Sequence, residues 1–172
     1  RLSLTTDAGE HSEVEFENAL IAVGTRPYRP THVPFDGEHV FDSDEILELG
    51  RLPRTLTVIG GGVIGVEYAT IFSALDVPVT LVEPKRSILD FVDREVVDDF
   101  MHQMRDRGMQ LRLGASVSSI AVVGDHTEVT TDDGRVVRSE MVLYAAGRVG
   151  SIGGLGLEAL GVQRDARGFI AV

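Results

Sequence analysis

The glycine-rich joint at residues 56–69, LTVIGGGVIGVEYA, constrains the fold more strongly than any other stretch of the chain. The apolar residues before the joint predict a strand over 56–59, and the apolar run after it has the spacing of a helix over 63–75. Three glycines match the pattern G-x-G-x-x-G: Gly60, Gly62 and Gly65. A strand, this pattern and a helix in immediate succession indicate a dinucleotide-binding turn.

Each glycine has a separate physical task in such a turn. Gly60 allows a bend that a side chain would obstruct, Gly62 lets the backbone approach a pyrophosphate, and Gly65 lets the helix lie close to the strand. Gly61 lies within the same turn. The helix start offers free N–H groups and about half a unit of positive charge, which suits a doubly anionic linker. We therefore predict that the phosphates of a dinucleotide bind here.

Glu83 ends the next predicted strand, eighteen residues after Gly65. An acid about twenty residues beyond the glycines is placed to accept hydrogen bonds from the adenosine ribose, and its charge repels a 2′-phosphate. This spacing favours NAD(H) over NADP(H), with a solvated strand end as the alternative role of Glu83. Lys85 and Arg86 follow at once, and either can partly neutralise Glu83 or bind a phosphate itself.

The order of the predicted elements indicates an α/β fold. Helical and strand patterns alternate after the glycine joint, and a period of two then replaces the helical period between residues 115 and 139. The predicted elements are strand 77–83, helix 94–107, strand 110–113, a small antiparallel β-meander and strand 141–146. The expected architecture is a Rossmann-like three-layer nucleotide-binding domain with a parallel sheet and this small meander.

The apolar residues of the two helices predict which faces are buried. In the first helix the apolar set is Ile64, Tyr68, Ile71, Phe72 and Leu75, beside a row of small residues, Gly65, Ala69 and Ser73. The small row predicts close contact with a strand. In the second helix the apolar set is Val96, Val97, Phe100, Met101 and Met104, with Asp93 as the predicted cap and Gly108 as the stop.

The segment before the joint predicts little regular structure. Residues 1–24 predict two short strands, RLSLTT and VEFENALIAVG, around the polar turn DAGEHSE. A lone hairpin is marginal in water, so these residues are expected to belong to something larger. Prolines at 27, 30 and 34 predict a surface linker, and DSDEILEL at 42–49 predicts a short helix.

The acidic composition limits the expected partners. The 172 residues include 16 basic and 27 acidic side chains, which gives a formal charge of −11. Such a field repels a phosphate backbone, so no nucleic-acid partner is expected. No apolar run approaches the roughly 18 residues of a membrane span, and the N-terminus lacks the order of a signal peptide. The expected location is therefore the cytoplasm, with no membrane partner.

Residue types that carry metal or covalent redox chemistry are scarce. The absence of cysteine excludes a disulfide, a thiolate metal site and a redox dithiol within these residues. The five histidines show no paired-ligand spacing, so no metal is expected. The acidic pairs at 98–99 and 132–133 fit an exposed helix face and a turn better than an acid/base pair. No catalytic residue is assigned to this chain.

Taken in order, GGGVIGVEYA, the acidic strand end LVEP, the predicted meander and LYAAGR resemble the flavin-dependent pyridine nucleotide-disulfide oxidoreductases. The resemblance covers nearly the whole chain. It implies that residues 1–40 are the end of an FAD-binding domain and its linker, with LIAVGTRP at the flavin-contacting motif. It further implies that residues 41–168 are the central NAD(P)-binding domain and that residues 169–172 begin the return to the FAD domain.

The resemblance also implies individual contacts to the dinucleotide. Glu67 would lie near the nicotinamide carboxamide and Gly147 near its ribose. Together, pattern and resemblance give the predicted contact set Gly60, Gly61, Gly62, Val63, Ile64, Gly65, Glu67, Glu83, Lys85, Val117 and Gly147. The family's ending GRxPN reads GRVGS here, so the chain departs from the family just past Arg148.

The activity implied by the resemblance belongs to a longer flavoprotein. The runs EYATIFSALDVPVTLVEP and RSILDFVDREVVDDF are most similar to the transhydrogenase branch, in which FAD passes hydride between NADPH and NAD. The parent is expected to carry an FAD domain and a dimerisation domain and to form a homodimer. Residues 1–172 alone are expected to bind NAD(H) or NADP(H) and to turn over nothing.

Two alternatives to that activity stay open. The first is the same domain of a dihydrolipoamide dehydrogenase or a related disulfide reductase, because a redox dithiol would lie upstream of residue 1. The second belongs to another class, a non-catalytic NAD-sensing module that has kept the fold.

Overall fold

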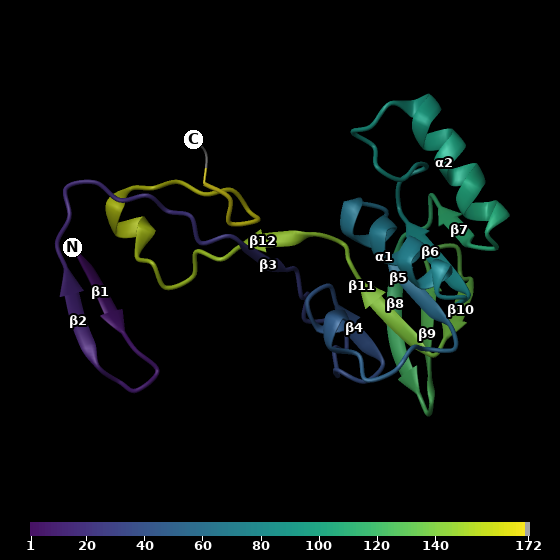
Figure 1. Ribbon diagram of the computed structural model, residues 1–172, viewed down its shortest axis with the longest axis horizontal. Helices are drawn as coiled ribbons and strands as arrows, with labels where there is room; N and C mark the ends of the chain where they lie inside the picture. Colours follow the sequence, from purple (N-terminus) through teal and green to yellow (C-terminus); the bar gives the residue numbers. More distant parts are fainter. Residues whose placement is uncertain (171–172) are drawn as a thin grey trace.

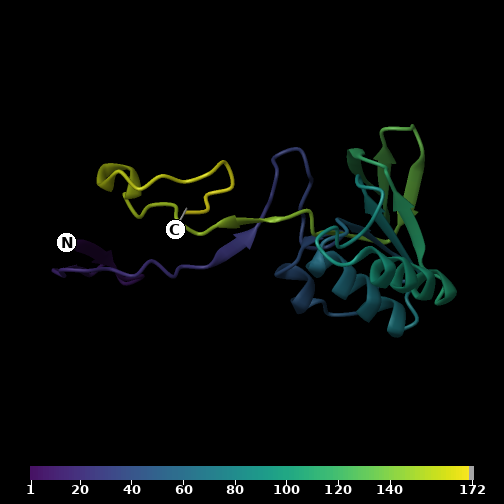
Figure 2. The same cartoon turned by 90° about the horizontal axis from the view of Figure 1, so that it is seen from above.

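The computed structural model describes residues 1–170, which form two parts. Figure 1 shows an α/β unit on the right, which contains the helices, and an extended arm on the left, which contains the N-terminus and the last described residues. The view from above in Figure 2 shows the same two parts joined by a narrow two-stranded ribbon. No helix among residues 1–170 combines the length and the apolar character that crossing a bilayer requires.

A five-stranded parallel sheet forms the centre of the α/β unit, with the strand order β4-β11-β5-β6-β7. Its strands are β4 (Val40–Asp42), β5 (Leu56–Ile59), β6 (Val79–Glu83), β7 (Gln110–Leu113) and β11 (Met141–Tyr144). In the register, Val58 pairs with Leu81 on one side and Leu143 on the other. All four residues of β5 are buried, as expected of a central strand covered on both faces.

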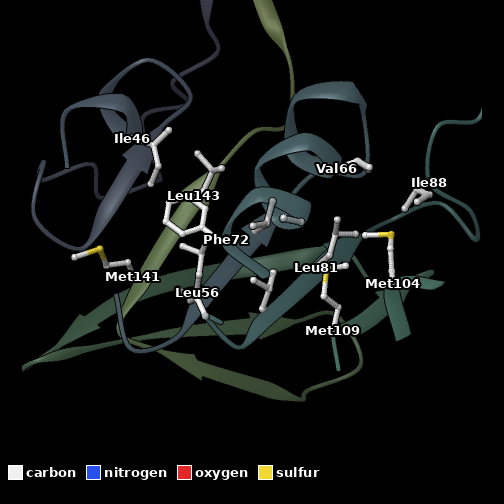
Figure 3. Packing of buried hydrophobic residues seen from close by; sticks show 14 of the residues in the cluster. Ile46, Leu56, Val66, Phe72, Leu81, Ile88, Met104, Met109, Met141 and Leu143 are labelled. Carbon is white, nitrogen blue, oxygen red and sulfur yellow. The ribbon is translucent and has the colours of Figure 1, made fainter. Parts of the chain in front are cut away.

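Two helices cover one face of the sheet, α1 (Val63–Ala74) between β5 and β6 and α2 (Arg94–Asp106) between β6 and β7. They enclose the larger core, in which the fully buried side chains include Leu56, Leu81, Ile88, Met104 and Leu143. In Figure 3, Phe72 of α1 lies beside Leu143, and Met104 of α2 points towards Leu81. The predicted core role of Met101 and Met104 is confirmed.

An antiparallel sheet covers the opposite face, with strand order β10-β9-β8. It comprises β8 (Val117–Val123), β9 (His126–Thr131) and β10 (Val136–Ser139). Val33, from the loop before β4, joins apolar residues of the two sheets in the second core cluster: Val40, Ile59, Ile120, Val129 and Val142. A buried hydroxyl joins the layers as well, because Thr57 of β5 donates to Ser139 Oγ at 2.8 Å, while within the antiparallel sheet Thr127 donates to the Ser139 carbonyl at 2.8 Å. The predicted three-layer α/β fold with a meander is therefore confirmed.

The face of α1 that meets the sheet is the small-residue face. Gly65 and Ala69 of the predicted small row are buried, together with Val66 and Phe72, while Ser73 of that row is half-buried. Ile71 is 52% exposed and Leu75 is 50% exposed, so assigning them to the buried face was wrong. Because the small residues allow the closest approach to β5, they turn Ile71 and Leu75 to the opposite side. Val96 of α2 is likewise exposed, while its neighbour Val97 is buried.

Local signals placed most element ends correctly. The Asp93 carboxylate accepts the N–H of Glu95 at 2.9 Å and caps α2, and Gly108 has φ +85° just beyond its end. The short helix predicted within 42–49 is confirmed, as a 3-10 helix. The Asp42 carboxylate accepts the N–H groups of Asp44 and Glu45, which starts only the single 3-10 turn η1 (Glu45–Glu48). Strand β11 ends at Tyr144, two residues earlier than predicted.

The arm begins with a hairpin of β1 (Leu2–Thr5) and β2 (His11–Val14). A tight turn with Gly9 at φ +80° brings the second strand forward to His11, so the strand predicted within VEFENALIAVG is not formed in residues 15–24. Every residue of the hairpin is exposed. The arm also contains the 3-10 turn η2 (Leu157–Leu160).

Strands β3 (Thr25–Pro27) and β12 (Arg148–Gly150) form the ribbon between the arm and the α/β unit. Arg148 fixes the ribbon to the unit because its guanidinium donates to Thr25 Oγ1 at 2.8 Å and to Asp44 Oδ1 at 3.1 Å. Arg29, two residues after β3, pairs with Asp42 at 2.8 Å and lies over the ring of Phe35.

Glu140 fastens the loop before β5 to the start of β11. Its side chain is 8% exposed, accepts the backbone N–H of Arg54 and pairs with Arg51 at 2.7 Å. The Arg51 guanidinium first, and then the Arg54 amide, lower the pKa of Glu140 to about 2. Because this folded-state pKa lies below the unfolded one, the stabilisation is present above the unfolded pKa and is lost as the pH falls towards 2.

We predict that Glu140→Gln lowers the free energy of unfolding at pH 7 by about 1–3 kcal/mol, because the Arg54 N–H and the Arg51 guanidinium lose a buried, charged acceptor. The difference from wild type should shrink steadily between pH 5 and pH 2, as measured by urea denaturation across that range. Glu17→Gln, on the exposed arm, makes the same charge change and should have no such effect. A difference that stays constant with pH would contradict the prediction.

Candidate functional site

The turn between β5 and α1 can be built only from glycine at two positions. Gly60 has φ +110°, and a Cβ there would lie 2.6 Å from the carbonyl oxygen of Ala145. A Cβ on Gly65 would lie 1.9 Å from the carbonyl oxygen of Gly60. Both clashes involve backbone, which cannot move aside. The tasks predicted for Gly60 and Gly65 are confirmed by these contacts.

Gly62 differs, because its side-chain position is open. It caps α1, is exposed, and a Cβ built on it meets no atom within 4 Å. Within the described residues, no group accepts a hydrogen bond from the N–H groups of Gly62, Val63 or Ile64. The start of α1 therefore presents free donors and the positive end of a helix dipole at an unobstructed surface.

Glu83 lies beneath this turn, at the carboxyl end of β6. Its side chain is buried, with Oε2 accepting the N–H of Gly61 at 2.5 Å and Oε1 accepting the N–H of Lys85 at 3.0 Å. The alternative of a solvated strand end is therefore wrong. A carboxylate has about four acceptor positions, so each oxygen retains one lone pair for a further donor.

The side chain of Lys85 pairs with a different carboxylate, that of Asp90. Its ammonium forms an ion pair with Asp90, and this hydrogen bond is the main cause that raises the pKa of Lys85. Arg86 follows, with its Cγ near Gly114 at the end of β7. Lys85 thus belongs to the edge of the site through its backbone N–H, while its charge is matched by Asp90.

Glu67 lies at a second place, on the outer face of α1. An open groove of about 550 Å³ runs there between α1, the loop after β6 and α2. Its lining is mostly apolar: Val63, Val66, Glu67, Thr70, Ile71, Leu89, Phe91, Val92 and Phe100. Glu67 is the one ionisable side chain among these residues. The structure therefore separates Glu67 from Glu83, one beside an open groove and the other buried under the glycine turn.

Gly147 lies beyond the carboxyl end of β11, with φ +124°, and accepts the N–H of Tyr28 at 3.1 Å. It lines a cavity of about 300 Å³ together with Arg148 and, from the arm, Arg167. Val117 opens β8, is half-buried and packs on the second core cluster, beside a register shift between Val117 and Ser119. The carboxyl edge of the sheet thus gathers Gly60, Glu83 and Gly147, whereas Val117 supports it from the meander layer.

The loop after β6 is the part of the site that sequence reasoning missed. Leu89 donates its N–H to the Gly61 carbonyl at 2.9 Å, and Ile88 is completely buried against the turn. The signal for it was the apolar pair Ile88–Leu89 directly after the polar run PKRS. Among residues 1–170, no group of three or more acidic or histidine side chains is placed to hold a metal ion.

The two kinds of glycine predict different stability effects. Gly65→Ala should destabilise the fold by about 1–3 kcal/mol or more, because its Cβ overlaps backbone. Gly62→Ala should cost less, about 0.5–1 kcal/mol, because its Cβ enters open space and only the poorer capping of alanine is felt. Thermal unfolding followed by circular dichroism measures both. Equal losses in the two variants would contradict this reading of the turn.

Comparison with known proteins gives relatives over the whole chain. The family model of the pyridine nucleotide-disulphide oxidoreductases matches residues 1–172. Proteins named soluble pyridine nucleotide transhydrogenase are 42% identical in Mycobacterium bovis and 38% identical in Yersinia pestis, each alignment covering 95% of this chain and 35% of the relative. The chain thus spans about a third of the length of these curated relatives.

Solved structures agree with the sequence relatives. The crystal structure of LpdA from Mycobacterium tuberculosis superposes with a TM-score of 0.92 at 31% identity, over 99% of this chain and 37% of that one. The HOCl-induced flavoprotein disulfide reductase RclA from Escherichia coli superposes with a TM-score of 0.84 at 28% identity, over 99% and 39%. With its glycine turn, parallel sheet and meander, the chain belongs to the pyridine nucleotide-disulphide oxidoreductase family.

Proposed function

We propose that the α/β unit binds a nicotinamide dinucleotide for a flavoprotein that passes hydride between NADPH and NAD through FAD. One observation carries the proposal. The free N–H groups at the start of α1 lie over a glycine turn that a buried carboxylate, Glu83, holds in place. Such an arrangement at the carboxyl edge of a parallel sheet is where dinucleotides bind in this class of fold.

The residues at this edge suit the parts of a dinucleotide. The N–H groups of Gly62, Val63 and Ile64 would hold the pyrophosphate, since a side chain at Gly62 would fill the same space. The remaining lone pairs of Glu83 would accept a ribose hydroxyl. Gly147, at the neighbouring strand end, and Glu67, on α1, are proposed for the nicotinamide half, with Val117 and Lys85 at the margin.

The chemistry is proposed for the longer protein. FAD supplies a group that accepts hydride from one nicotinamide and returns it to another. Residues 1–40 and 169–172 are proposed as parts of the FAD domain, of which residues 171–172 lie outside the described part of the chain. A homodimer in the cytoplasm is proposed for the parent, by analogy with the family.

Sequence identity favours the transhydrogenase branch. Relatives named soluble pyridine nucleotide transhydrogenase are 38–42% identical over 95% of this chain. The alternative remains the same domain of a dihydrolipoamide dehydrogenase or other disulfide reductase. A redox dithiol in the parent protein, outside these cysteine-free 172 residues, would favour that alternative.

The first prediction concerns binding. The chain should bind NADH, and Gly62→Ala should weaken binding at least tenfold, because the added Cβ occupies the place of the pyrophosphate. Isothermal titration calorimetry measures both, with circular dichroism to show that the variant is folded. Asp98→Asn, an exposed change on α2, serves as the control and should bind like wild type. Wild-type protein that binds neither NADH nor NADPH would overturn the proposed function.

A further prediction concerns turnover. Residues 1–172 alone should not reduce a thio-NAD analogue with NADPH, because hydride must pass through the flavin, whereas the parent flavoprotein should do so. The absorbance of the reduced analogue measures the rate in both proteins. Turnover by the isolated chain at the parent's rate would contradict the flavin-dependent route. A parent protein that reduces a disulfide and not the analogue would select the disulfide-reductase alternative.

A further inference from the structure

The loop between β6 and α2, residues 84–92, is fixed on the glycine turn. Leu89 donates to the Gly61 carbonyl at 2.9 Å, and Val92 donates to the Leu89 carbonyl at 2.9 Å. Leu89 has φ +46°, a conformation that is unfavourable for a side chain of this kind and persists only where its surroundings enforce it. These contacts set the direction of the chain at the next residue, Asp90.

Asp90 points at Lys85 across this loop, and the two side chains form an ion pair. The backbone of Lys85 is fixed independently, because its N–H bonds to Glu83 Oε1 at 3.0 Å and its carbonyl accepts the N–H of Gly114 at 2.8 Å. The backbones of Lys85 and Asp90 are therefore both held in place at the dinucleotide edge. The hydrogen bond between them raises the pKa of Lys85 and lowers the pKa of Asp90.

We propose that Asp90 is a positioning residue for coenzyme choice: it engages the Lys85 ammonium in an ion pair, so that this charge is not available to a 2′-phosphate and the site prefers NADH to NADPH. The inference rests on the proposed binding function. The two coenzymes differ by a 2′-phosphate with nearly two negative charges, which would lie beside the ribose and therefore beside Glu83. Lys85 is the cation whose backbone touches that carboxylate.

Charge balance explains the effect. With the ion pair formed, the 2′-phosphate faces the negative Glu83 and Asp90, and Lys85 is already matched. Removing the Asp90 charge leaves Lys85 free to pair with the phosphate, while the interaction with NADH changes little. Both side chains of the pair are more than half exposed, and exposed ion pairs contribute little to stability, so the neutral variant should fold normally.

The test measures dissociation constants for NADH and NADPH by calorimetry on wild type and Asp90→Asn. The ratio of the NADPH constant to the NADH constant should fall at least fivefold in the variant. Asp90→Glu, made in the wild-type protein, keeps a carboxylate and should have the wild-type ratio. Asp98→Asn, which removes an equally exposed acid paired with Arg94, should leave the ratio unchanged.

A second substitution identifies the cation. Adding Lys85→Gln to Asp90→Asn should abolish the gain in NADPH binding. A shift that survives in the double variant would assign the effect to another base such as Arg86 and overturn the proposal, as would an unchanged ratio in Asp90→Asn. If wild-type protein binds both coenzymes and one of these two results is obtained, this inference is overturned. The proposed binding function would still stand in that case. Wild-type protein that binds neither coenzyme overturns both.

Discussion

The hydrogen bond from the Gly61 N–H to the Glu83 carboxylate organises the dinucleotide edge. It joins the turn after β5 to the end of β6 at 2.5 Å inside the protein, where an unpaired carboxylate would be costly. The Lys85 amide satisfies the second oxygen, so the charge is buried with partners on both sides. The turn is thereby held open at Gly62, and the helix start that follows keeps its N–H groups free. A charged residue read from sequence as a ligand contact is thus also a structural support.

Much of the α/β unit was predictable because its signals are local. The glycine pattern, the cap at Asp93 and the stop at Gly108 each depend on a few neighbouring residues, and each appears where it was predicted. The faces of α1 were less predictable. Apolar character shows that Ile71 can be buried, but which side meets the sheet depends on the close approach that Gly65 and neighbouring small residues permit. That is a property of two packed elements and not of one.

The site also has a part that was predictable from local sequence and a part that depends on tertiary contacts. The glycine turn and the acid at the end of β6 follow from spacing alone, and the sequence placed them together correctly. The loop over 84–92 did not follow, because its path depends on a bond from Leu89 to Gly61 and on the burial of Ile88. The placement of Lys85 required the same loop, since only the folded chain brings Asp90 to it. The sequence therefore identifies the charged residues of the site, and the tertiary structure determines which of them form ion pairs with one another.

The ribbon of β3 and β12 makes the α/β unit suitable for insertion into other proteins. Arg26 and Val149 are direct partners in it, so the chain enters and leaves the α/β unit at neighbouring points. A module with adjacent ends can be spliced into a surface turn of a host without separating the host's own flanking segments. Arg29 and Arg148 form polar contacts at this junction, and these contacts would orient the inserted unit relative to its host. Gene recombination and protein engineering can therefore both insert the α/β unit as one continuous segment.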